Sequence, residues 1–215
     1  TGTRSGLMGT GLGLQDNGGD DLSGTANGTF AFATTIASGG TYSVTVATQP
    51  TTPWQTCVVS SGSGAVTNAD ITTVTVACTT NSYTIGGMLS GLAAGDTVVL
   101  RNNGGNNLAM SANGSFTFTS AVLSGQSYNV TVFTNPVSPI AQTCVVTNGA
   151  GIVAGANIAS VLVACTTNKY TINATVNGLG GTGLVLRNNG GDDLTINANG
   201  AYPFATTLAS GATYN

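Results

Sequence analysis

One stretch occurs three times in this chain and limits what the chain can fold into. Its middle copy is Leu100-Arg101-Asn102-Asn103-Gly104-Gly105-Asn106-Asn107-Leu108. The first glycine of the stretch recurs as Gly18, Gly104 and Gly190, which are 86 residues apart in both steps. A repeat of this length is too long for one coil of a solenoid and matches a small domain. The 215 residues should therefore form an array of about two and a half similar domains.

The same comparison sets the expected domain boundaries. Residues 1–81 should form a first repeat that lacks its first strand, residues 82–168 a complete second repeat, and residues 169–215 the first half of a third. The linkers, Thr79-Thr80-Asn81-Ser82 and Thr166-Thr167-Asn168, contain neither glycine nor proline. Because threonine favours an extended backbone, the last strand of one repeat should run almost directly into the next. We therefore expect the repeats to stack as a stiff rod.

Within the second repeat the hydrophobic residues alternate with polar ones and show no helical period. Val130 and Val132 share one face of a predicted strand, and Cys144 and Val146 share a face of another. The Asn-Asn-Gly-Gly stretch predicts a bend at the tip of a hairpin, and Asn113-Gly114 predicts a second two-residue hairpin turn. About seven short strands with turns between them are typical of a β-sandwich. The predicted fold is all-β: tandem seven-stranded antiparallel Ig-like sandwiches.

The four cysteines fall as one pair in each complete repeat, Cys57 with Cys78 and Cys144 with Cys165. A structural zinc site would need a Cys-x-x-Cys spacing or nearby histidines, and the chain has no histidine. We therefore predict one disulfide per complete repeat. Closing a loop of about 20 residues contributes on the order of 3 kcal/mol in the chain-entropy model, which matters for a small domain. Disulfides imply an oxidising compartment, so we expect an extracellular or cell-surface protein.

Only 5% of the residues are charged, and the net charge is −3. Four scattered basic residues cannot neutralise a phosphate backbone, which argues against nucleic acid as a partner. The sequence also has no unbroken apolar run long enough to predict a membrane span. Disorder is improbable on composition, because 41% of the residues are hydrophobic and recur at strand spacing.

The acidic pairs beside the glycine turns, Asp20-Asp21 and Asp192-Asp193, are candidate Ca²⁺ ligands. The alternative is turn chemistry, because Asp and Asn side chains bond their own backbone in turns. The second repeat favours turn chemistry, because Asn106-Asn107 replaces both charges there while the turn is kept. With no histidine, a serine nucleophile has no evident base, and the acidic residues occur as sequence neighbours rather than across a cleft. We expect no enzyme activity, no cofactor and no metal.

Four Asn-x-Ser/Thr sequons are possible glycosylation sites, at Asn27, Asn113, Asn129 and Asn173. Trp54 is the only tryptophan and lies in a proline-containing loop. Its ring is suited either to stacking on a sugar or to a contact between repeats. The contact is favoured, because the second repeat also has apolar residues there, Ile140-Ala141.

Several motifs carry a resemblance to the Ig-like and prealbumin-like β-sandwich repeats of bacterial secreted and surface proteins. They are Gly91-Leu92 followed by Val98-Val99-Leu100, Asn113-Gly114-Ser115-Phe116-Thr117-Phe118, Tyr128-Asn129-Val130-Thr131-Val132, Gln142-Thr143-Cys144-Val145-Val146 and Val161-Leu162-Val163-Ala164-Cys165. Such sandwiches serve as stalks, adhesin modules and fibre subunits. The resemblance departs in one respect. Relatives on Gram-positive pili carry a Lys-to-Asn isopeptide bond, whereas Lys169 is the only lysine here and its counterpart is Ser82.

The function expected from these features is structural: the shaft of an extracellular bacterial filament or a surface stalk, with copies of the same protein as partners. The alternative is an adhesin or carbohydrate-binding module that contacts host or matrix glycans through Trp54 and the glycine-rich tips. A surface with few charges favours the first function, because it removes the repulsion that keeps soluble proteins apart.

Overall fold

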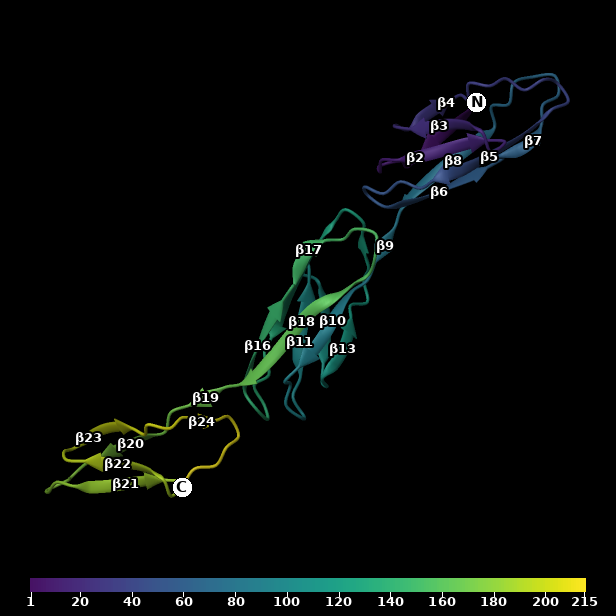
Figure 1. The fold of residues 1–215 in the computed structure, drawn as a ribbon. Coiled ribbons are helices and arrows are strands. Elements are labelled where there is room, and N and C mark those ends of the chain that lie inside the picture. The colour runs from purple at the N-terminus through teal and green to yellow at the C-terminus, as the bar shows by residue number, and fades with distance from the viewer. The chain divides into compact units, whose positions relative to one another are not determined.

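The computed structural model describes residues 1–215, which form 24 β-strands and no helix (Figure 1). The all-β fold of tandem sandwich repeats is as predicted. The chain divides into two compact units. The first contains residues 1–86, 117–129 and 150–159, and the second contains residues 87–116, 130–149 and 160–215. No helix is long and apolar enough to cross a lipid bilayer.

The first repeat consists of two four-stranded sheets. Their orders are β4-β1-β8-β6 and β3-β2-β5-β7. The strands are β1 (Gly2–Ser5), β2 (Leu12–Asp16), β3 (Asp20–Gly24), β4 (Gly28–Phe30), β5 (Thr41–Thr48), β6 (Gln55–Ser60), β7 (Ser63–Ala65) and β8 (Val74–Thr80). Each sheet turns its alternating apolar side chains toward the other, as the burial of every second residue in β2 and β8 shows. The resulting core contains Leu7, Leu12, Leu14, Phe30, Val44, Cys57, Val74, Val76 and Cys78.

The Asn-Gly-Gly stretch forms a hairpin tip in all three repeats, as predicted. Between β2 and β3, Asn17 and Gly18 both have positive φ, 51° and 72°. Asn103 and Gly104 repeat this geometry at 49° and 73°. Two consecutive residues with positive φ make a turn that matches the twist of the flanking strands, and Gly19 N closes it by donating to Asp16 O at 3.1 Å. This geometry explains why glycine follows asparagine there.

The second repeat has the same sheets and one addition. Its strands are β9 (Ser82–Tyr83), β10 (Ile85–Ser90), β11 (Val98–Asn102), β12 (Asn106–Met110), β13 (Gly114–Thr117), β14 (Val122–Leu123), β15 (Ser127–Thr134), β16 (Gln142–Thr147), β17 (Ala150–Ile152) and β18 (Ile158–Thr167). The sheet orders are β13-β10-β18-β16 and β12-β11-β15-β17. The addition is the short ladder in which β9 pairs with β14.

The third repeat contains the corresponding early strands. They are β19 (Lys169–Tyr170), β20 (Asn173–Val176), β21 (Leu184–Asn188), β22 (Asp192–Ile196), β23 (Gly200–Pro203) and β24 (Leu208–Ala209). β19 pairs with β24, β20 with β23, and β21 with β22. Ile196 and Phe204 are the buried apolar side chains of this segment.

Two details of the sandwich differ from the sequence-based expectation. The first repeat has eight strands instead of about seven, because the three residues of β7 pair with the edge of β5 without any apolar alternation. In addition, β1 runs parallel to β8, from Gly2 opposite Val74 to Ser5 opposite Ala77. The fold is therefore antiparallel except where its first and last strands meet.

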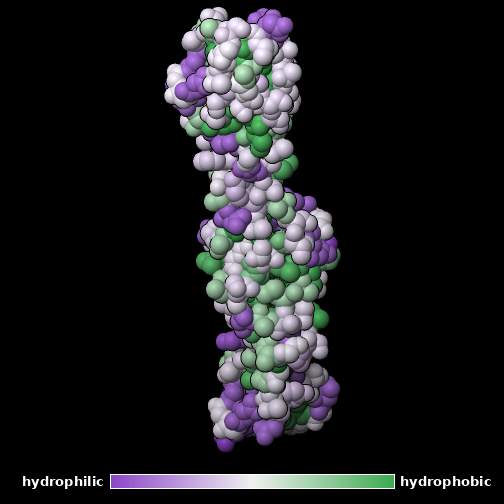
Figure 2. Space-filling model, turned by 90° about the vertical axis from the view of Figure 1, so that its right-hand side faces the viewer, coloured by the Kyte–Doolittle hydropathy of each residue, from purple (hydrophilic) through white to green (hydrophobic).

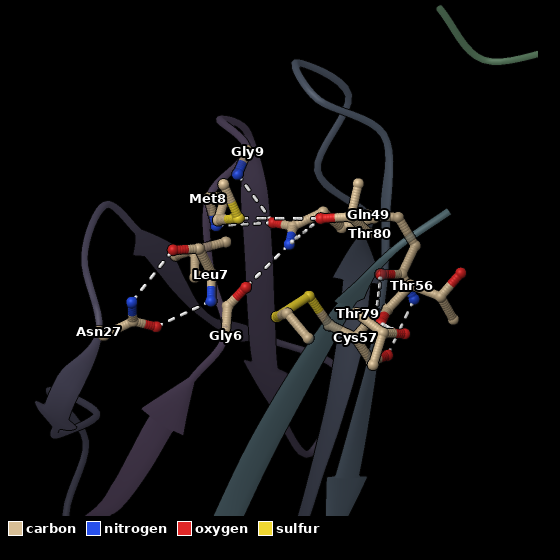
Figure 3. The surroundings of a disulfide bond; sticks show 12 residues. Gly6, Leu7, Met8, Gly9, Asn27, Gln49, Thr56, Cys57, Thr79 and Thr80 are labelled. Carbon is tan, nitrogen blue, oxygen red and sulfur yellow. Dashed lines mark hydrogen bonds between the residues drawn. A yellow bond between two sulfur atoms is a disulfide. The ribbon is translucent and has the colours of Figure 1, made fainter. Parts of the chain in front are cut away.

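Asn113-Gly114 was expected to close a hairpin, and that prediction was wrong. β12 and β13 belong to different sheets, so the chain crosses between the layers at this dipeptide, as it does at Asn27-Gly28 between β3 and β4. The Asn27 side chain accepts a hydrogen bond from Leu7 N at 2.8 Å and donates one to Leu7 O at 3.1 Å. Asparagine is thus used here to hold the corner against the segment that follows β1 (Figure 3).

Candidate functional site: the junctions between repeats

The residue that links the first repeat to the second is hydrogen-bonded to both. Asn81 lies between β8 and β9, and its N–H donates to Trp54 O at 3.0 Å. Its carbonyl oxygen accepts from Ser124 N at 2.8 Å. The Asn81 side chain also accepts from Thr56 Oγ1 at 2.8 Å. All of these residues belong to the first compact unit, so the linker is a bonded part of that unit.

Trp54 makes the remaining contacts of this first junction. Its backbone N–H donates to Ser124 Oγ at 3.0 Å. Its ring packs on the backbone of Gly155, where a Cβ atom would lie only 2.4 Å from Trp54 Cε2. Trp54 as a whole remains 40% exposed. Glycine at position 155 is therefore what allows an indole to lie flat against this loop.

The second junction repeats the same bonds with different side chains. Asn168 N donates to Ala141 O at 2.9 Å, and Ser210 N donates to Asn168 O at 2.8 Å. Ala141 N donates to Ser210 Oγ at 2.9 Å. Thr143 Oγ1 donates to Asn168 Oδ1 at 2.8 Å. These residues all lie in the second compact unit, so the two junctions are built alike, one in each unit.

A Ser-Gly turn supplies the far side of each junction. Gly125 and Gly211 both have positive φ, 84° and 82°, which glycine adopts at little cost. The turn places the serine N–H and hydroxyl side by side, so that Ser124 binds Asn81 and Trp54 at once. Ser124 is 3% exposed. A change to alanine would remove the acceptor for the Trp54 N–H in a site that water barely reaches.

Behind the first junction, Gln55 ties β6 to the loop after β1. Its Oε1 accepts from Met8 N at 2.8 Å and from Gly9 N at 2.7 Å. Its Nε2 donates to Gly6 O at 2.8 Å and to Thr80 Oγ1 at 3.2 Å. Gln55 is 1% exposed. The two hydrogen bonds that its amide oxygen can accept and the two that its amide nitrogen can donate are therefore all made inside the protein. Gln142 makes the corresponding bonds to Ala93 N and Gly91 O.

The disulfides lie next to these glutamines in the sheet. Cys57 of β6 is bonded to Cys78 of β8, and Cys144 of β16 to Cys165 of β18. All four cysteines are buried, and none has a free thiol. Gln49, in the loop before β6, hydrogen-bonds both main-chain groups of Cys57. Its Oε1 accepts from Cys57 N at 2.7 Å, and its Nε2 donates to Cys57 O at 3.0 Å (Figure 3).

The structure does not bring the acidic pairs together as a cation site. Asp20 accepts from Thr34 N at 2.8 Å, while Asp21 accepts from Gln15 Nε2 at 2.7 Å, so neighbouring carboxylates serve different partners. In the third repeat Asp192 accepts from Thr206 N at 3.0 Å. No group of three or more His, Cys, Asp or Glu side chains is placed to hold a metal ion.

Asp193 instead forms an ion pair with Arg187 on the neighbouring strand. Arg187 Nε lies 2.5 Å from Asp193 Oδ1, and Arg187 Nη2 donates to Asp193 Oδ2 at 2.8 Å. The hydrogen bond from Arg187, aided by its charge, lowers the pKa of Asp193 below its ordinary value. The second repeat has Arg101 donating to Asn107 at the same place, so this position serves a cross-strand pair with or without a charge.

The sequon asparagines divide into two kinds. Asn27 and Asn113 use their side-chain amide groups to hold the corner between sheets, since Asn113 Nδ2 donates to Leu92 O at 2.8 Å. A sugar on that nitrogen would compete with the bond. Asn129 and Asn173 are exposed residues of β15 and β20.

The residues that make the junctions were not singled out by sequence reasoning, apart from Trp54. A signal was present, because an asparagine follows the two threonines of both linkers, as Asn81 and Asn168, and the Ser-Gly dipeptide recurs as Ser124-Gly125 and Ser210-Gly211. Polar residues in a short linker predict solvent exposure, and only the fold shows that they face another repeat.

The comparisons with known proteins add no family to this description. No protein-family model matches the chain. A comparison with curated proteins likewise finds no match.

Proposed function

We propose that this chain is a structural segment of an extracellular filament or surface stalk, in which sandwich repeats form a mechanical shaft. The observation that carries the proposal is the junction. Three hydrogen bonds fix the linker asparagine to the repeats on both sides, a fourth joins the two repeats directly, and the same four recur at the next linker. Neutral hydrogen bonds contribute about 1 kcal/mol each, so each junction resists bending by a few kcal/mol. A flexible tether would not need matched donors and acceptors in its linker.

The character of the surface supports copies of the same protein as partners. The face drawn in Figure 2 is mostly pale, with hydrophobic and strongly hydrophilic residues in small patches. Val58 and Val145, at matching positions of the edge strands β6 and β16, are 59% and 61% exposed. An edge strand with exposed apolar side chains and few charges lacks the usual protection against pairing with another chain. Lateral packing of copies fits this surface.

The disulfides support the extracellular location in this proposal. Buried disulfides persist in oxidising compartments, and both complete repeats contain one. In a shaft they also limit how far a repeat can extend under load, because they cross-link the strands β6 and β8 that end at a junction.

Residual dipolar couplings measured on the whole chain test the stiffness that this function requires. In the wild type, couplings from the amides of β1–β8 and from those of β10–β18 should fit one alignment tensor. The double variant Asn81→Gly/Asn168→Gly removes both side-chain bonds and frees the linker backbone, so its repeats should need separate tensors. Asn68→Gly, in an exposed loop, is the matched control. Independent alignment of the wild-type repeats would contradict the proposal.

A glycan array separates the shaft from the carbohydrate-binding alternative. Trp54 makes its backbone bond to Ser124 and packs its ring on Gly155, which leaves part of the ring exposed. We expect no saturable sugar binding by the wild type. Binding that Trp54→Ala abolishes would favour the adhesin instead.

A further inference from the structure

One cross-strand position carries a different net charge in each repeat. In the first repeat Gln15 Nε2 donates to Asp21 Oδ1 at 2.7 Å, so this pair keeps one negative charge. In the second repeat Arg101 Nε donates to Asn107 Oδ1 at 2.7 Å, so the equivalent pair keeps one positive charge. In the third repeat an arginine and an aspartate neutralise each other. The first and second repeats therefore present opposite, unneutralised charges at equivalent places.

Both of these charged side chains can still bind a partner from outside their own repeat. The third repeat shows how such an arginine binds a carboxylate, because Arg187 donates to Asp193 through both Nε and Nη2. Arg101 uses only its Nε on Asn107, and Asp21 accepts only at Oδ1. Two parallel, charge-assisted hydrogen bonds to a carboxylate are stronger than one bond to an amide. A carboxylate from elsewhere is therefore the group that would complete the bonding of Arg101.

The side chains next to Arg101 form a raised, partly apolar surface, here called the raised face: Val99, Arg101, Ala109 and Phe133. Val99 and Arg101 lie two residues apart in β11, and Ala109 of β12 is opposite Val99, so their side chains share one side of the sheet. The Arg101 guanidinium lies over the Phe133 ring of β15, 3.3 Å from its centroid. Phe133 is 50% exposed. Arginine and aromatic side chains are types enriched at protein–protein interfaces.

The first repeat has small side chains on the equivalent surface, here called the flat face: Gly13, Asp21, Ser23 and Ala47. The strands β2, β3 and β5 pair in the same register as β11, β12 and β15, including the shift after Gly13 and after Val99. Gly13 and Ala47 therefore stand where the second repeat has Val99 and Phe133. Asp21, Ser23 and Ala47 are exposed. The flat face thus leaves room for a ring to lie on the strands beside the Asp21 carboxylate.

We propose that the flat face of one copy of this chain binds the raised face of a second copy. Arg101 of one copy then pairs with Asp21 of the other, and the Phe133 ring packs on the strands at Gly13 and Ala47. Opposite charges and large side chains against small ones both favour this match. Two raised faces would bring Arg101 against Arg101, and two flat faces Asp21 against Asp21, which like-charge repulsion disfavours. The contact therefore joins unlike repeats of two copies.

Each of the two faces lies within one compact unit. The flat face belongs to the first unit and the raised face to the second. A contact between unlike faces is heterologous, so a copy bound through its flat face still has its raised face for another copy. The choice of a second copy as the partner rests on the proposed function. Junction stiffness is measured within one chain and this contact between chains, so either can fail alone.

Sedimentation equilibrium of the whole chain tests the contact. At low ionic strength the average mass of the wild type should rise with concentration up to the millimolar range, and added salt should weaken the association because it screens exposed charges. Asp21→Arg should weaken the association at least about tenfold, because two cations then meet. Asn107→Asp gives the second repeat the ion pair of the third, so that Arg101 is neutralised within its own copy, and a similar loss should follow.

Phe133→Ala should also weaken the association at least about tenfold, because the contact loses the burial of a large ring. Leu162→Ala is the matched control. Leu162 has nearly the same exposure, 49%, but lies on β18 in the other sheet of the repeat. The Leu162→Ala chain should associate like the wild type.

A mixture of two variants tests whether the contact joins unlike faces. The Asp21→Arg chain keeps its raised face and the Asn107→Asp chain keeps its flat face, so each alone should stay monomeric while the mixture forms dimers as tightly as the wild type. Dimers in the mixture also show that both variants fold. The proposal would be overturned by a wild type that stays monomeric at millimolar concentration and low salt, or by an association that Asp21→Arg leaves unchanged. An equal loss in Leu162→Ala and Phe133→Ala, or a mixture that stays monomeric, would overturn it as well.

Discussion

Replacing Gln55 with leucine should selectively destabilise the first repeat. The two side chains have similar volumes, so Gln55→Leu introduces little steric change. It removes all four hydrogen bonds of the amide, including those accepted from Met8 N and Gly9 N. The Met8 and Gly9 N–H groups and the Gly6 carbonyl stay in place, and leucine offers them no new hydrogen-bond partner.

The expected cost follows from how buried these partners are. The Gly9 bond is fully buried, whereas the Met8 N–H and the Gly6 carbonyl lie nearer to solvent and recover part of their bonding from water. A buried donor left without an acceptor costs about 1–3 kcal/mol. We therefore expect the free energy of unfolding of the first repeat to fall by about 2–3 kcal/mol. With a urea dependence near 1 kcal/mol/M for a domain of this size, the midpoint should fall by about 2–3 M.

Tryptophan fluorescence follows the part of the chain that the substitution affects. Trp54 is the only tryptophan and precedes Gln55 directly, so urea titration followed by its emission reports the first repeat together with the junction on which the ring packs. Gln126→Leu, at an exposed glutamine of the second repeat, is the control and should change the midpoint by less than about 0.5 M, because exposed substitutions are nearly neutral. An unchanged midpoint in Gln55→Leu, or an equal loss in the control, would refute the reasoning.

Three further outcomes follow from the structure. The double variant Cys57→Ala/Cys78→Ala should lower the free energy of unfolding of the first repeat by about 3 kcal/mol in urea titration, as expected for opening a loop of about 20 residues, while a loss below about 1 kcal/mol would contradict it. Gly155→Ala should shift the Trp54 emission to longer wavelength without unfolding the chain, because the new Cβ displaces the ring; an unchanged spectrum would mean that the ring does not rest on Gly155. The pKa of Asp193 is lowered by Arg187, so the stabilisation from this pair is present above the ordinary aspartate pKa of 3.8 and is lost as the pH falls through the lowered value. An NMR titration of Arg187→Gln should return the Asp193 pKa toward 3.8, and an identical titration in both proteins would exclude the ion pair as the cause.

The sequence predicts the sandwich and its disulfides well, because the signals for both are local or repeated. Alternation within β8 places Val74, Val76 and Cys78 on one face, and the tip geometry at Asn103-Gly104 follows from which residues tolerate positive φ. The same local signal misled at Asn113-Gly114 and would mislead equally at Asn27-Gly28. A turn motif indicates that the chain reverses, whereas the sheet that the next strand joins depends on β1, more than 20 residues away in sequence.

The junction was harder to predict for a related reason. Gln55 lies two residues before Cys57, so strand alternation alone would place it on the buried face, yet a polar residue beside a proline loop suggests exposure. Asn81 and Ser124 each look like ordinary loop residues, and 43 positions separate them. Their contact forms only when two folded repeats come together. The hydrophobic and turn pattern within a single repeat therefore gives no information about it.

The matched junctions also imply a direction along the array. Each repeat meets its predecessor with a Ser-Gly turn and its successor with the start of a strand, Trp54-Gln55 or Ala141-Gln142, so the two contact surfaces differ. Such a contact is heterologous and does not close on itself, and further repeats can be added without any new kind of interaction. Stability then couples between nearest neighbours: a repeat with two junctions loses both when it unfolds, while a repeat with one junction loses only that one. Unfolding should therefore begin at a repeat that has a single junction and proceed inward one repeat at a time.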